Sequence, residues 1–262
     1  MEILMSESTI VCQSKGGVLQ IGLNRPERKN AMTGAMYEAL ALALAEADQD
    51  VNVRVVVLHG NESAFCSGND ISDFAAAAEA TTERPSHKFM HAVIGFGKPL
   101  LASVNGPAVG IGATMLLHCD MVFAGSNLAL AFPFVKLGLC PEFASSALLA
   151  QRVGHQRAAE LFLLGTACTA ERALSLGLVN HVLAPEKSLE QALATASTLA
   201  QASPDAVTTT KSLMRGNTSP ELLTRIQLEN EQFARLLQTP QAQAAFASFM
   251  KKPAPSAAAS LE

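Results

Sequence analysis

Glu142 stands in an apolar stretch of the sequence where its carboxyl group could work as a general base. It follows Pro141 at an expected helix start, and its neighbours include Leu139 and Phe143. Burial among such side chains would raise the pKa of the carboxyl toward neutral pH, where a proton-transferring base works best. An acid in the first helical turn is equally well explained by the positive end of the helix dipole. These residues alone leave both interpretations open.

Two glycine-containing segments could bind a developing negative charge through their backbone. Residues 67–70 (Ser-Gly-Asn-Asp) follow an expected buried strand, and residues 110–112 (Gly-Ile-Gly) open an expected helix. Free N–H groups at helix starts carry a partial positive charge. Two such groups facing one another would form an oxyanion hole for a thioester carbonyl. Tight turns that need no substrate explain the glycines at least as well.

The composition suits one large domain, or one domain with a short extension. The chain has 262 residues, of which 49% are hydrophobic and 16% charged, and its formal net charge is −4. No basic tract indicates a nucleic-acid partner. The 100–117 stretch carries no charge, but Asn-Gly-Pro at 105–107 divides it into a strand and a helix. We therefore expect buried core there and no membrane partner.

The cysteines and the chain ends favour a soluble, cytoplasmic protein. The five cysteines form no Cys-x-x-Cys pair, and their odd number fits reduced thiols. No basic segment leads into an apolar run at the N-terminus, so no signal peptide is expected. The chain ends in Ser-Leu-Glu, not in the peroxisomal address Ser-Lys-Leu. The Gly-Ile-Gly segment lacks the third glycine of a dinucleotide-binding motif, so we do not expect a bound dinucleotide. We also expect no metal site.

Strands alternate with helices up to about residue 184 and helices alone follow, which predicts an α/β core with a C-terminal helical extension. We expect a flexible N-terminus over 1–9, the core over 10–184, a helical region over 185–250 and a flexible tail over 251–262. The expected strands are a hairpin over 10–23, then 53–58, 100–104, 121–124 and 178–183. The expected helices follow Thr33 and Ile71, cover 86–96 and 110–118, begin at Pro141 and continue through 144–152, and cover 156–164, 170–176, 186–203, 205–215 and 220–238.

Four segments, in matching order and spacing, resemble landmarks of one enzyme family. Residues 64–71 (Ala-Phe-Cys-Ser-Gly-Asn-Asp-Ile) resemble the first signature of the crotonase, or enoyl-CoA hydratase/isomerase, superfamily. Residues 98–112 resemble its second signature, and residues 169–179 resemble its late helix–strand segment. Residues 25–32 (Arg-Pro-Glu-Arg-Lys-Asn-Ala-Met) resemble its early loop on the CoA side. Each piece alone is common, but the joint pattern is highly specific.

The resemblance implies a fold, an assembly and a substrate class. The fold would be α/β, a crotonase-like spiral of ββα units with a C-terminal helical extension. The helices of residues 185–250 would mediate trimer formation or cover the site as a lid. Members of the family usually form homotrimers or dimers of trimers. The substrate would be an acyl-CoA, and no separate cofactor is expected because coenzyme A is part of that substrate.

The resemblance also implies roles for individual residues. The backbone N–H groups of Asn69 and Ile111 would hold the thioester oxygen. Arg28 and Lys29 would pair with CoA phosphates, although two exposed basic side chains explain them almost as well. The other residues implied at the CoA and substrate side are Ser67, Gly68, Asp70, Ile71 and Gly110, and those implied at the acyl pocket are Phe74, Phe134 and Phe143.

The acids that are present select a reaction within the family. Hydratases of the family use two glutamates to place a water molecule, and the matching positions here hold Thr114 and Phe134. Neither side chain can take a proton from water. Residues 137–146 instead resemble the site of peroxisomal-type Δ3,Δ2-enoyl-CoA isomerases, whose single glutamate matches Glu142. The resemblance therefore implies an isomerase in which Glu142 carries a proton from C2 to C4.

Two alternatives stay open within this resemblance. A related bacterial isomerase of ring-bearing acyl-CoA substrates carries an aspartate at the position of Glu142, so the substrate could belong to aromatic degradation. The absence of both hydratase acids would also suit a homologue that binds acyl-CoA without catalysis. The acid retained at position 142 argues against that second alternative.

Overall fold

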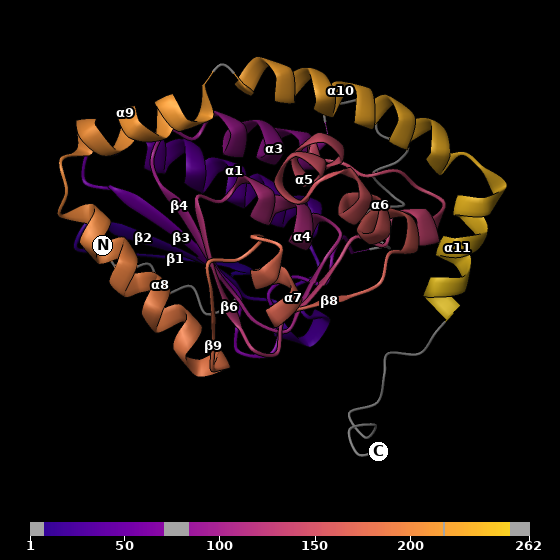
Figure 1. The fold of residues 1–262 in the computed structure, drawn as a ribbon, viewed down its shortest axis with the longest axis horizontal. Coiled ribbons are helices and arrows are strands. Elements are labelled where there is room, and N and C mark those ends of the chain that lie inside the picture. Colours follow the sequence, from indigo (N-terminus) through magenta and orange to yellow (C-terminus); the bar gives the residue numbers. More distant parts are fainter. Residues whose placement is uncertain (1–7, 71–83, 217, 252–262) are drawn as a thin grey trace.

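The computed structural model describes residues 8–70, 84–216 and 218–251. Its centre is a six-stranded sheet in the order β1-β2-β3-β4-β6-β9 (Figure 1). The β1–β2 pair is the predicted antiparallel hairpin, and the other pairs are parallel. The strands of this sheet are β1 (Ile10–Lys15), β2 (Val18–Leu23), β3 (Val55–His59), β4 (Leu100–Val104), β6 (Met121–Gly125) and β9 (His181–Leu183).

Helices cover both faces of this sheet, which explains the continuous apolar runs of its central strands. Successive strand residues point to opposite faces. Val55 and Val57 of β3 belong to the hydrophobic cluster that includes α8, whereas Val56 and Leu58 belong to the larger cluster that includes α1 and α3. The helices that cover the sheet are α1 (Gly34–Gln49), α3 (Pro85–Gly95) and α8 (Pro185–Ala200).

Helix α1 begins as the sequence predicts. The Thr33 hydroxyl accepts a hydrogen bond from the N–H of Met36 at 3.3 Å, which satisfies one of the free donors of the first turn. The predicted apolar face is buried, and Leu40 and Leu44 are no more than 1% exposed. Burying such a leucine stabilises the fold by about 1.5–3 kcal/mol.

A second, three-stranded sheet lies beside the first and was not predicted. It has the order β5-β7-β8, and its strands have only two or three residues, too few for an alternating pattern to be read. The helix predicted over 110–118 is divided into α4 and the 3₁₀ helix η2. The elements of this region are β5 (Pro107–Val109), α4 (Ile111–Thr114), η2 (Met115–His118), β7 (Ala129–Ala131), η3 (Val135–Leu137), α5 (Ser145–Val153), α6 (His155–Leu164), β8 (Cys168–Thr169) and α7 (Ala170–Ser175).

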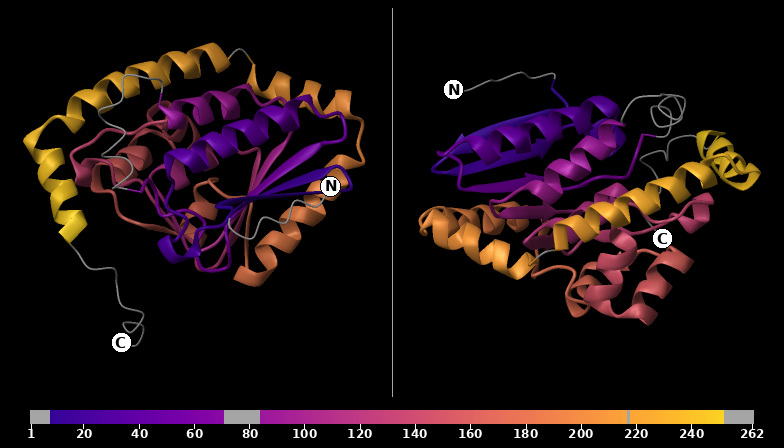
Figure 2. Two further views of the ribbon diagram at one scale, coloured as in Figure 1. Left: turned by 180° about the vertical axis from the view of Figure 1, so that it is seen from behind. Right: turned by 90° about the horizontal axis from the view of Figure 1, so that it is seen from above.

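Three further helices form an arc along the outer edge of the molecule (Figures 1 and 2). They are α9 (Pro204–Arg215), α10 (Thr218–Leu237) and α11 (Pro240–Lys251). Helix α9 is fixed to the core by an ion pair of 2.8 Å between Lys211 and Asp120. Helix α10 buries Ile226 and Phe233. Helix α11 falls almost entirely within the helical region expected over 185–250, although no separate helix was predicted there.

Three of the sequence predictions fall wholly or mostly on parts of the chain outside the described residues. These are the flexible N-terminus over 1–9, the helix from Ile71 and the tail over 251–262. In the part that is described, no helix is long and apolar enough to cross a membrane.

Candidate active site

The loop between η3 and α5 carries Glu142 into the interior, where its side chain is only 6% exposed. The prediction that a helix begins at Pro141 is wrong, because α5 starts at Ser145. Phe143 and Ala144 have φ angles of 62° and 54°, in the left-handed region, which residues of a regular α-helix do not adopt. Glu142 therefore does not occupy the first turn of α5, and the helix-dipole interpretation of this acid loses its structural basis.

The carboxyl of Glu142 has one side-chain hydrogen-bond donor among the described residues. Thr114 Oγ1 of α4 donates to Glu142 Oε1 at 2.6 Å. Burial raises the pKa of Glu142 to about 8, an increase that the Thr114 hydrogen bond reduces and the nearby Glu229 carboxyl enlarges. A carboxyl with this pKa can take and return a proton near neutral pH.

The two glycine-containing segments lie against one another. The N–H of Cys66 donates to the carbonyl of Pro107 at 3.0 Å, and the N–H of Val109 donates back to the carbonyl of Cys66 at 2.9 Å. A Cβ atom on Gly112 would lie 2.5 Å from the same Cys66 carbonyl oxygen. Only glycine at position 112 permits this approach, because real Cβ atoms do not come so close to a backbone oxygen.

The N–H groups of Asn69 and Ile111 have no protein acceptor among the described residues. Asn69 and Met32 form a parallel β-bridge in which the hydrogen bonds are made by the residues just before and just after Asn69. The N–H of Asn69 itself therefore points away from Met32. Ile111 is the first residue of α4, and the N–H there has no partner within the helix. Thr114, the partner of Glu142, lies one helical turn after Ile111.

The side chain of Asn69 is also fixed. The hydroxyl of Tyr37 in α1 donates a hydrogen bond to Asn69 Oδ1. Because Tyr37 is 4% exposed and packed in the core, this contact ties the Asn69 backbone to the rigid part of the fold. Nothing in the local sequence around Asn69 pointed to Tyr37.

The early loop packs against the first signature segment. Ser67 donates to this loop twice, from its hydroxyl to the carbonyl of Arg28 at 3.2 Å and from its N–H to the carbonyl of Lys29 at 3.0 Å. The side chain of Arg28 is 55% exposed, and Lys29 is exposed as well. Both are therefore accessible to an anionic ligand, and their pairing with CoA phosphates stays a prediction.

Asp70 is buried and forms an ion pair with Arg25, with 2.8 Å between Oδ2 and Nη1. Arg25 also donates to the carbonyl of Ala31 at 3.0 Å. Asn30 joins the same segments, because its amide donates to the carbonyls of Ala64 and Phe65 at 3.0 Å each. These contacts give Asp70 a structural part in holding the early loop, which the sequence analysis did not foresee.

The aromatic residues predicted for the acyl pocket have different surroundings. Phe134 is 5% exposed and precedes η3, whereas Phe143 is fully buried and stacks on His118 with 4.0 Å between ring centroids. Phe74 and Ile71 lie outside the described residues. Contact of Phe134 and Phe143 with an acyl chain stays a prediction.

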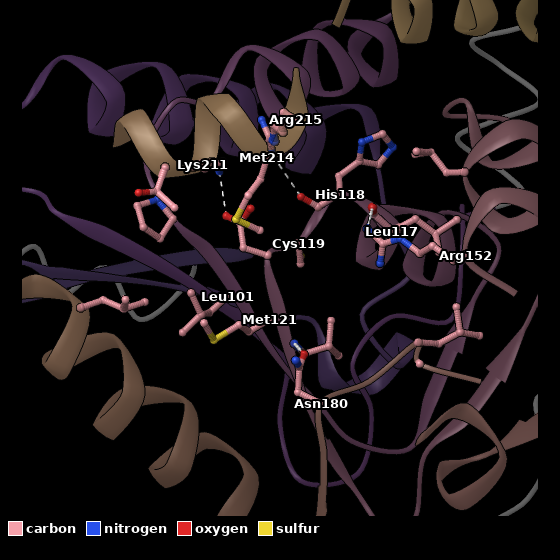
Figure 3. A pocket seen from close by; sticks show the side chains of 18 of the residues that line it. Leu101, Leu117, His118, Cys119, Met121, Arg152, Asn180, Lys211, Met214 and Arg215 are labelled. Carbon is pink, nitrogen blue, oxygen red and sulfur yellow. Dashed lines mark hydrogen bonds and ion pairs between the residues drawn. The ribbon is translucent and has the colours of Figure 1, made fainter. Parts of the chain in front are cut away.

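A cavity of about 720 Å³ lies between the first sheet, η2, α5, α9 and the segment that follows α7 (Figure 3). Glu142, Asn69 and Ile111 are not among its lining residues. Its basic side chains have partners: Lys211 pairs with Asp120, and Arg152 and Arg215 donate to backbone carbonyls, as the dashed lines in Figure 3 show. The site described above therefore does not coincide with this cavity.

Metal-ligating side chains do not gather in the described part of the chain. No group of three or more His, Cys, Asp or Glu residues there has an arrangement that could hold an ion.

Comparison with known proteins gives the class. The family model described as enoyl-CoA hydratase/isomerase matches residues 13–257. The chain is 37% identical over 220 residues to enoyl-CoA delta isomerase 2 of Rattus norvegicus, covering 81% of this chain and 56% of that protein. It is 33% identical over 252 residues to 2,3-dehydroadipyl-CoA hydratase of Escherichia coli, covering 96% and 98%.

Solved structures agree. The structure of Pseudomonas aeruginosa OdaA has a TM-score of 0.91 and 42% identity, covering 94% of this chain and 100% of that one. An enoyl-CoA hydratase/isomerase from Pseudoalteromonas atlantica has a TM-score of 0.89 and 36% identity, covering 95% and 99%. The chain belongs to the enoyl-CoA hydratase/isomerase family and has the crotonase fold.

Proposed function

We propose that the chain is a Δ3,Δ2-enoyl-CoA isomerase with Glu142 as its one proton carrier. Glu142 removes a proton from C2 of a 3-enoyl-CoA, and the electron pair of that C–H bond moves into the thioester to form a dienolate. Protonated Glu142 then returns the same proton to C4. The product is the conjugated trans-2-enoyl-CoA, with no net gain or loss of atoms.

One observation carries this proposal: the buried carboxyl of Glu142, with its pKa raised to about 8, is hydrogen-bonded to Thr114 at 2.6 Å. Thr114 stands where the resemblance implies the first hydratase acid, and Phe134 stands where it implies the second. A single carboxyl is enough for isomerisation, because C2 and C4 of a planar dienolate present one common face.

The backbone supplies the second part of the proposed mechanism. Negative charge develops on the thioester oxygen as the C2 proton leaves. The N–H groups of Asn69 and Ile111, which have no acceptor among the described residues, would stabilise that charge more than the uncharged carbonyl of the substrate. Removing one such donor costs about 2.7–4 kcal/mol of transition-state stabilisation in a measured hydrolase.

Hydration of a 2-enoyl-CoA is a second candidate, because a relative that the chain matches over 98% of its length is named a hydratase. The side chains near Glu142 favour isomerisation over it. A water molecule attacking C3 needs an acid–base group to take its proton while C2 is protonated. Thr114 and Phe134 cannot provide the second such group.

The experiment uses two cuvettes and the absorbance of the conjugated enoyl thioester. Trans-3-hexenoyl-CoA is placed in one and trans-2-hexenoyl-CoA in the other. The proposal predicts a rise in absorbance in the first and no loss in the second. Loss in the second alone would establish the hydratase and contradict the proposal. No change in absorbance in either cuvette would also contradict the proposal. The remaining explanations would be a ring-bearing substrate or acyl-CoA binding without catalysis, and a substrate panel and a CoA-ligand titration would distinguish them.

The variant Glu142→Gln tests the role of the carboxyl. Gln keeps the shape and a hydrogen bond to Thr114, but it cannot accept the C2 proton. We expect kcat to fall by at least ~100-fold, the lower range for one acid–base group. The circular dichroism spectrum and the Kd for a saturated acyl-CoA should stay those of the parent. Turnover within a few fold of the parent would remove Glu142 from the mechanism.

A further inference from the structure

The turn that follows Glu142 has an unusual backbone. Phe143 and Ala144 both adopt left-handed φ angles, 62° and 54°, although neither is glycine. Left-handed backbone is unfavourable for residues with a Cβ atom, so two in succession persist only where surrounding contacts hold them. We call residues 143–144 the left-handed turn, and two buried polar side chains outside the proposed reaction hold it.

Glu229 of α10 holds the turn from the outer side. The N–H of Ala144 donates to Glu229 Oε2 at 2.6 Å, and the N–H of Ser146 donates to Glu229 Oε1 at 3.0 Å. Both donors belong to the start of α5, where N–H groups have no partner within the helix. A carboxylate from a helix more than eighty residues away thus replaces the usual side-chain N-cap. Glu229 is 6% exposed, so water does not compete for these bonds.

His118 of η2 holds the turn from the inner side. Its ring stacks on Phe143 with 4.0 Å between centroids, and its Nε2 lies 2.8 Å from the carbonyl oxygen of Phe143. A carbonyl oxygen only accepts, so Nε2–H is the donor. Burial lowers the pKa of His118 to about 3, and the ring is therefore neutral. The turn is clamped between η2, which follows α4, and α10 of the C-terminal arc.

From this clamp we propose that Glu229 is a positioning residue for the proton transfer: by accepting from Ala144 and Ser146 it fixes the left-handed turn, and so keeps the Glu142 carboxyl against Thr114 and at the reacting carbons. The inference rests on the proposed isomerase function. It also makes α10 part of the active-site framework and not only an outer cover.

The charges around Glu142 and Glu229 affect the pH dependence of the reaction. That pH dependence is a readout that would not change if Glu229 had a purely structural role. Among the described residues, the polar and titratable groups that face Glu142 are Thr114 from α4, Cys66 from the first signature segment, Cys140 from the same loop and Glu229 from α10. Burial raises the pKa of the Cys66 thiol to about 12 and raises that of Cys140, so both thiols are neutral. Glu229 carries the carboxyl group in this set.

The surroundings of Glu229 are similarly defined. Burial raises the pKa of Glu229 above its ordinary value, while the hydrogen bonds from the start of α5 and the charge of Arg225 in its own helix oppose that rise. The charge of Glu229 favours the protonated form of Glu142 and so adds to the raised pKa of that group. Removing the charge must therefore lower the pKa of Glu142, and the pH at which kcat/KM is half-maximal must move down.

The test compares Glu229→Gln with the matched control Glu231→Gln, an exposed glutamate two residues further along α10. Gln cannot accept from both N–H groups, because its NH₂ would face one of them. At a pH well above the half-maximal value, we expect kcat of Glu229→Gln to fall about ten- to a hundredfold, since a misplacement near 1 Å costs up to that much. KM should stay within about twofold, and the acid limb should move to lower pH. Glu231→Gln should behave as the parent.

Three results would overturn the proposal. The first is a parent-like kcat and pH profile in Glu229→Gln. The second is a loss of kcat with an unmoved acid limb, and the third is a rise in KM alone; either would leave Glu229 a merely structural residue. If Glu229→Gln does not fold, Glu229→Asp serves instead. It keeps the charge and shortens the reach, so kcat should fall with little shift of the limb, and parent kinetics in that variant would overturn the proposal.

An inactive parent enzyme would be a different failure. If the parent does not isomerise 3-enoyl-CoA substrates, the proposed function is wrong, and the positioning role is wrong with it. If the parent is active, Glu142→Gln is inactive and Glu229→Gln is indistinguishable from the parent, the function stands and only the positioning role fails.

Discussion

At the scale of single residues, the environment of Glu142 sets the pH range in which the proposed reaction runs. The carboxyl must be ionised before it can take the C2 proton, and burial raises its pKa to about 8. We therefore expect kcat/KM to increase with pH up to about 8 and to fall tenfold per unit below that value. A pH profile of the parent enzyme checks this, and a limb near the ordinary carboxyl pKa would contradict it.

The same raised pKa affects stability. Between the ordinary value of 4.5 and about 8, the folded state holds a proton on Glu142 that the unfolded chain has released. The free energy of unfolding therefore loses a contribution as the pH rises through this window. In denaturant titrations, Glu142→Gln should gain stability relative to the parent from pH 4.5 toward 8, and a constant difference would argue against the burial effect.

Thr114 provides the opposite test to Glu229. Its hydroxyl donates to Glu142 at 2.6 Å and favours the ionised form of the acid. Thr114→Val keeps the side-chain shape and removes the donor, so the pKa of Glu142 should rise and the acid limb of kcat/KM should move to higher pH. We expect kcat/KM near neutral pH to fall about tenfold or more, in line with a lost bond to a charged group.

Thr114→Ser is the matched control for that measurement. It keeps the hydroxyl and loses only a methyl group, so its acid limb should coincide with that of the parent. If Val and Ser variants give the same limb, the hydroxyl does not tune Glu142.

The residues of the site divide into those the sequence could indicate and those it could not. Glu142 and the two glycine-containing segments are read from type and spacing. The partners Thr114 and Glu229 are not, because hydrogen bonds across 28 and 85 residues of chain leave no local signal. The sequence indicated only that Thr114 stands where hydratases have an acid, whereas in the structure its hydroxyl donates a hydrogen bond to the acid Glu142.

At the scale of elements, the close approach of α4 and the first signature segment predicts the effect of Gly112→Ala. The new Cβ would meet the carbonyl oxygen of Cys66 at 2.5 Å, so α4 must move away from residues 66–70. We expect a loss of about 1–3 kcal/mol in unfolding free energy from overpacking. A drop in kcat should accompany it, since the N–H of Ile111 moves away from that of Asn69.

Gly95→Ala is the control for this change. Gly95 ends α3, it is exposed, and a Cβ there meets nothing within 4 Å. It should retain parent kcat and parent or slightly higher stability. Equal effects of the two alanine substitutions, measured by denaturation and by the absorbance assay, would remove the special role of the α4 contact.

Long elements were predicted well and short or interrupted ones were not. Helix α1 and strand β4 carry clear patterns of apolar residues and were predicted within a few residues. The strands of the second sheet have two or three residues each, which is too short for periodicity. The start of α5 was placed at Pro141 because proline favours a first helical turn, but the contacts of Glu229 and His118 impose a left-handed turn first.

At the scale of the whole molecule, the alternation of strands and helices gave the α/β class. The spiral itself came from the resemblance, because no pattern in the sequence says which strands pair. The division at about residue 184 into a core and a C-terminal helical region stays a prediction, and the contacts of Glu229 and Lys211 show that α9 and α10 share polar contacts with the core.

The assembly remains our proposal, a homotrimer or a dimer of trimers. Exposed apolar side chains on α6 and α9 are consistent with further burial between subunits, among them Leu163, Leu164, Leu213 and Met214. Light scattering during size-exclusion chromatography should give three or six times the chain mass of 27.5 kDa. A mass of one or two chains across a tenfold range of concentration would contradict the proposal.

The proton path is the central claim, and an isotope label tests it most directly. The substrate is trans-3-hexenoyl-CoA with deuterium in both C2 positions, incubated in ordinary water, and the position of deuterium in the product is read by NMR and mass spectrometry. If Glu142 alone carries the proton, a substantial fraction of the conjugated product contains deuterium at C4. A product with only solvent hydrogen at C4 would contradict a single-carboxyl transfer and would require a second acid or a water molecule in the path.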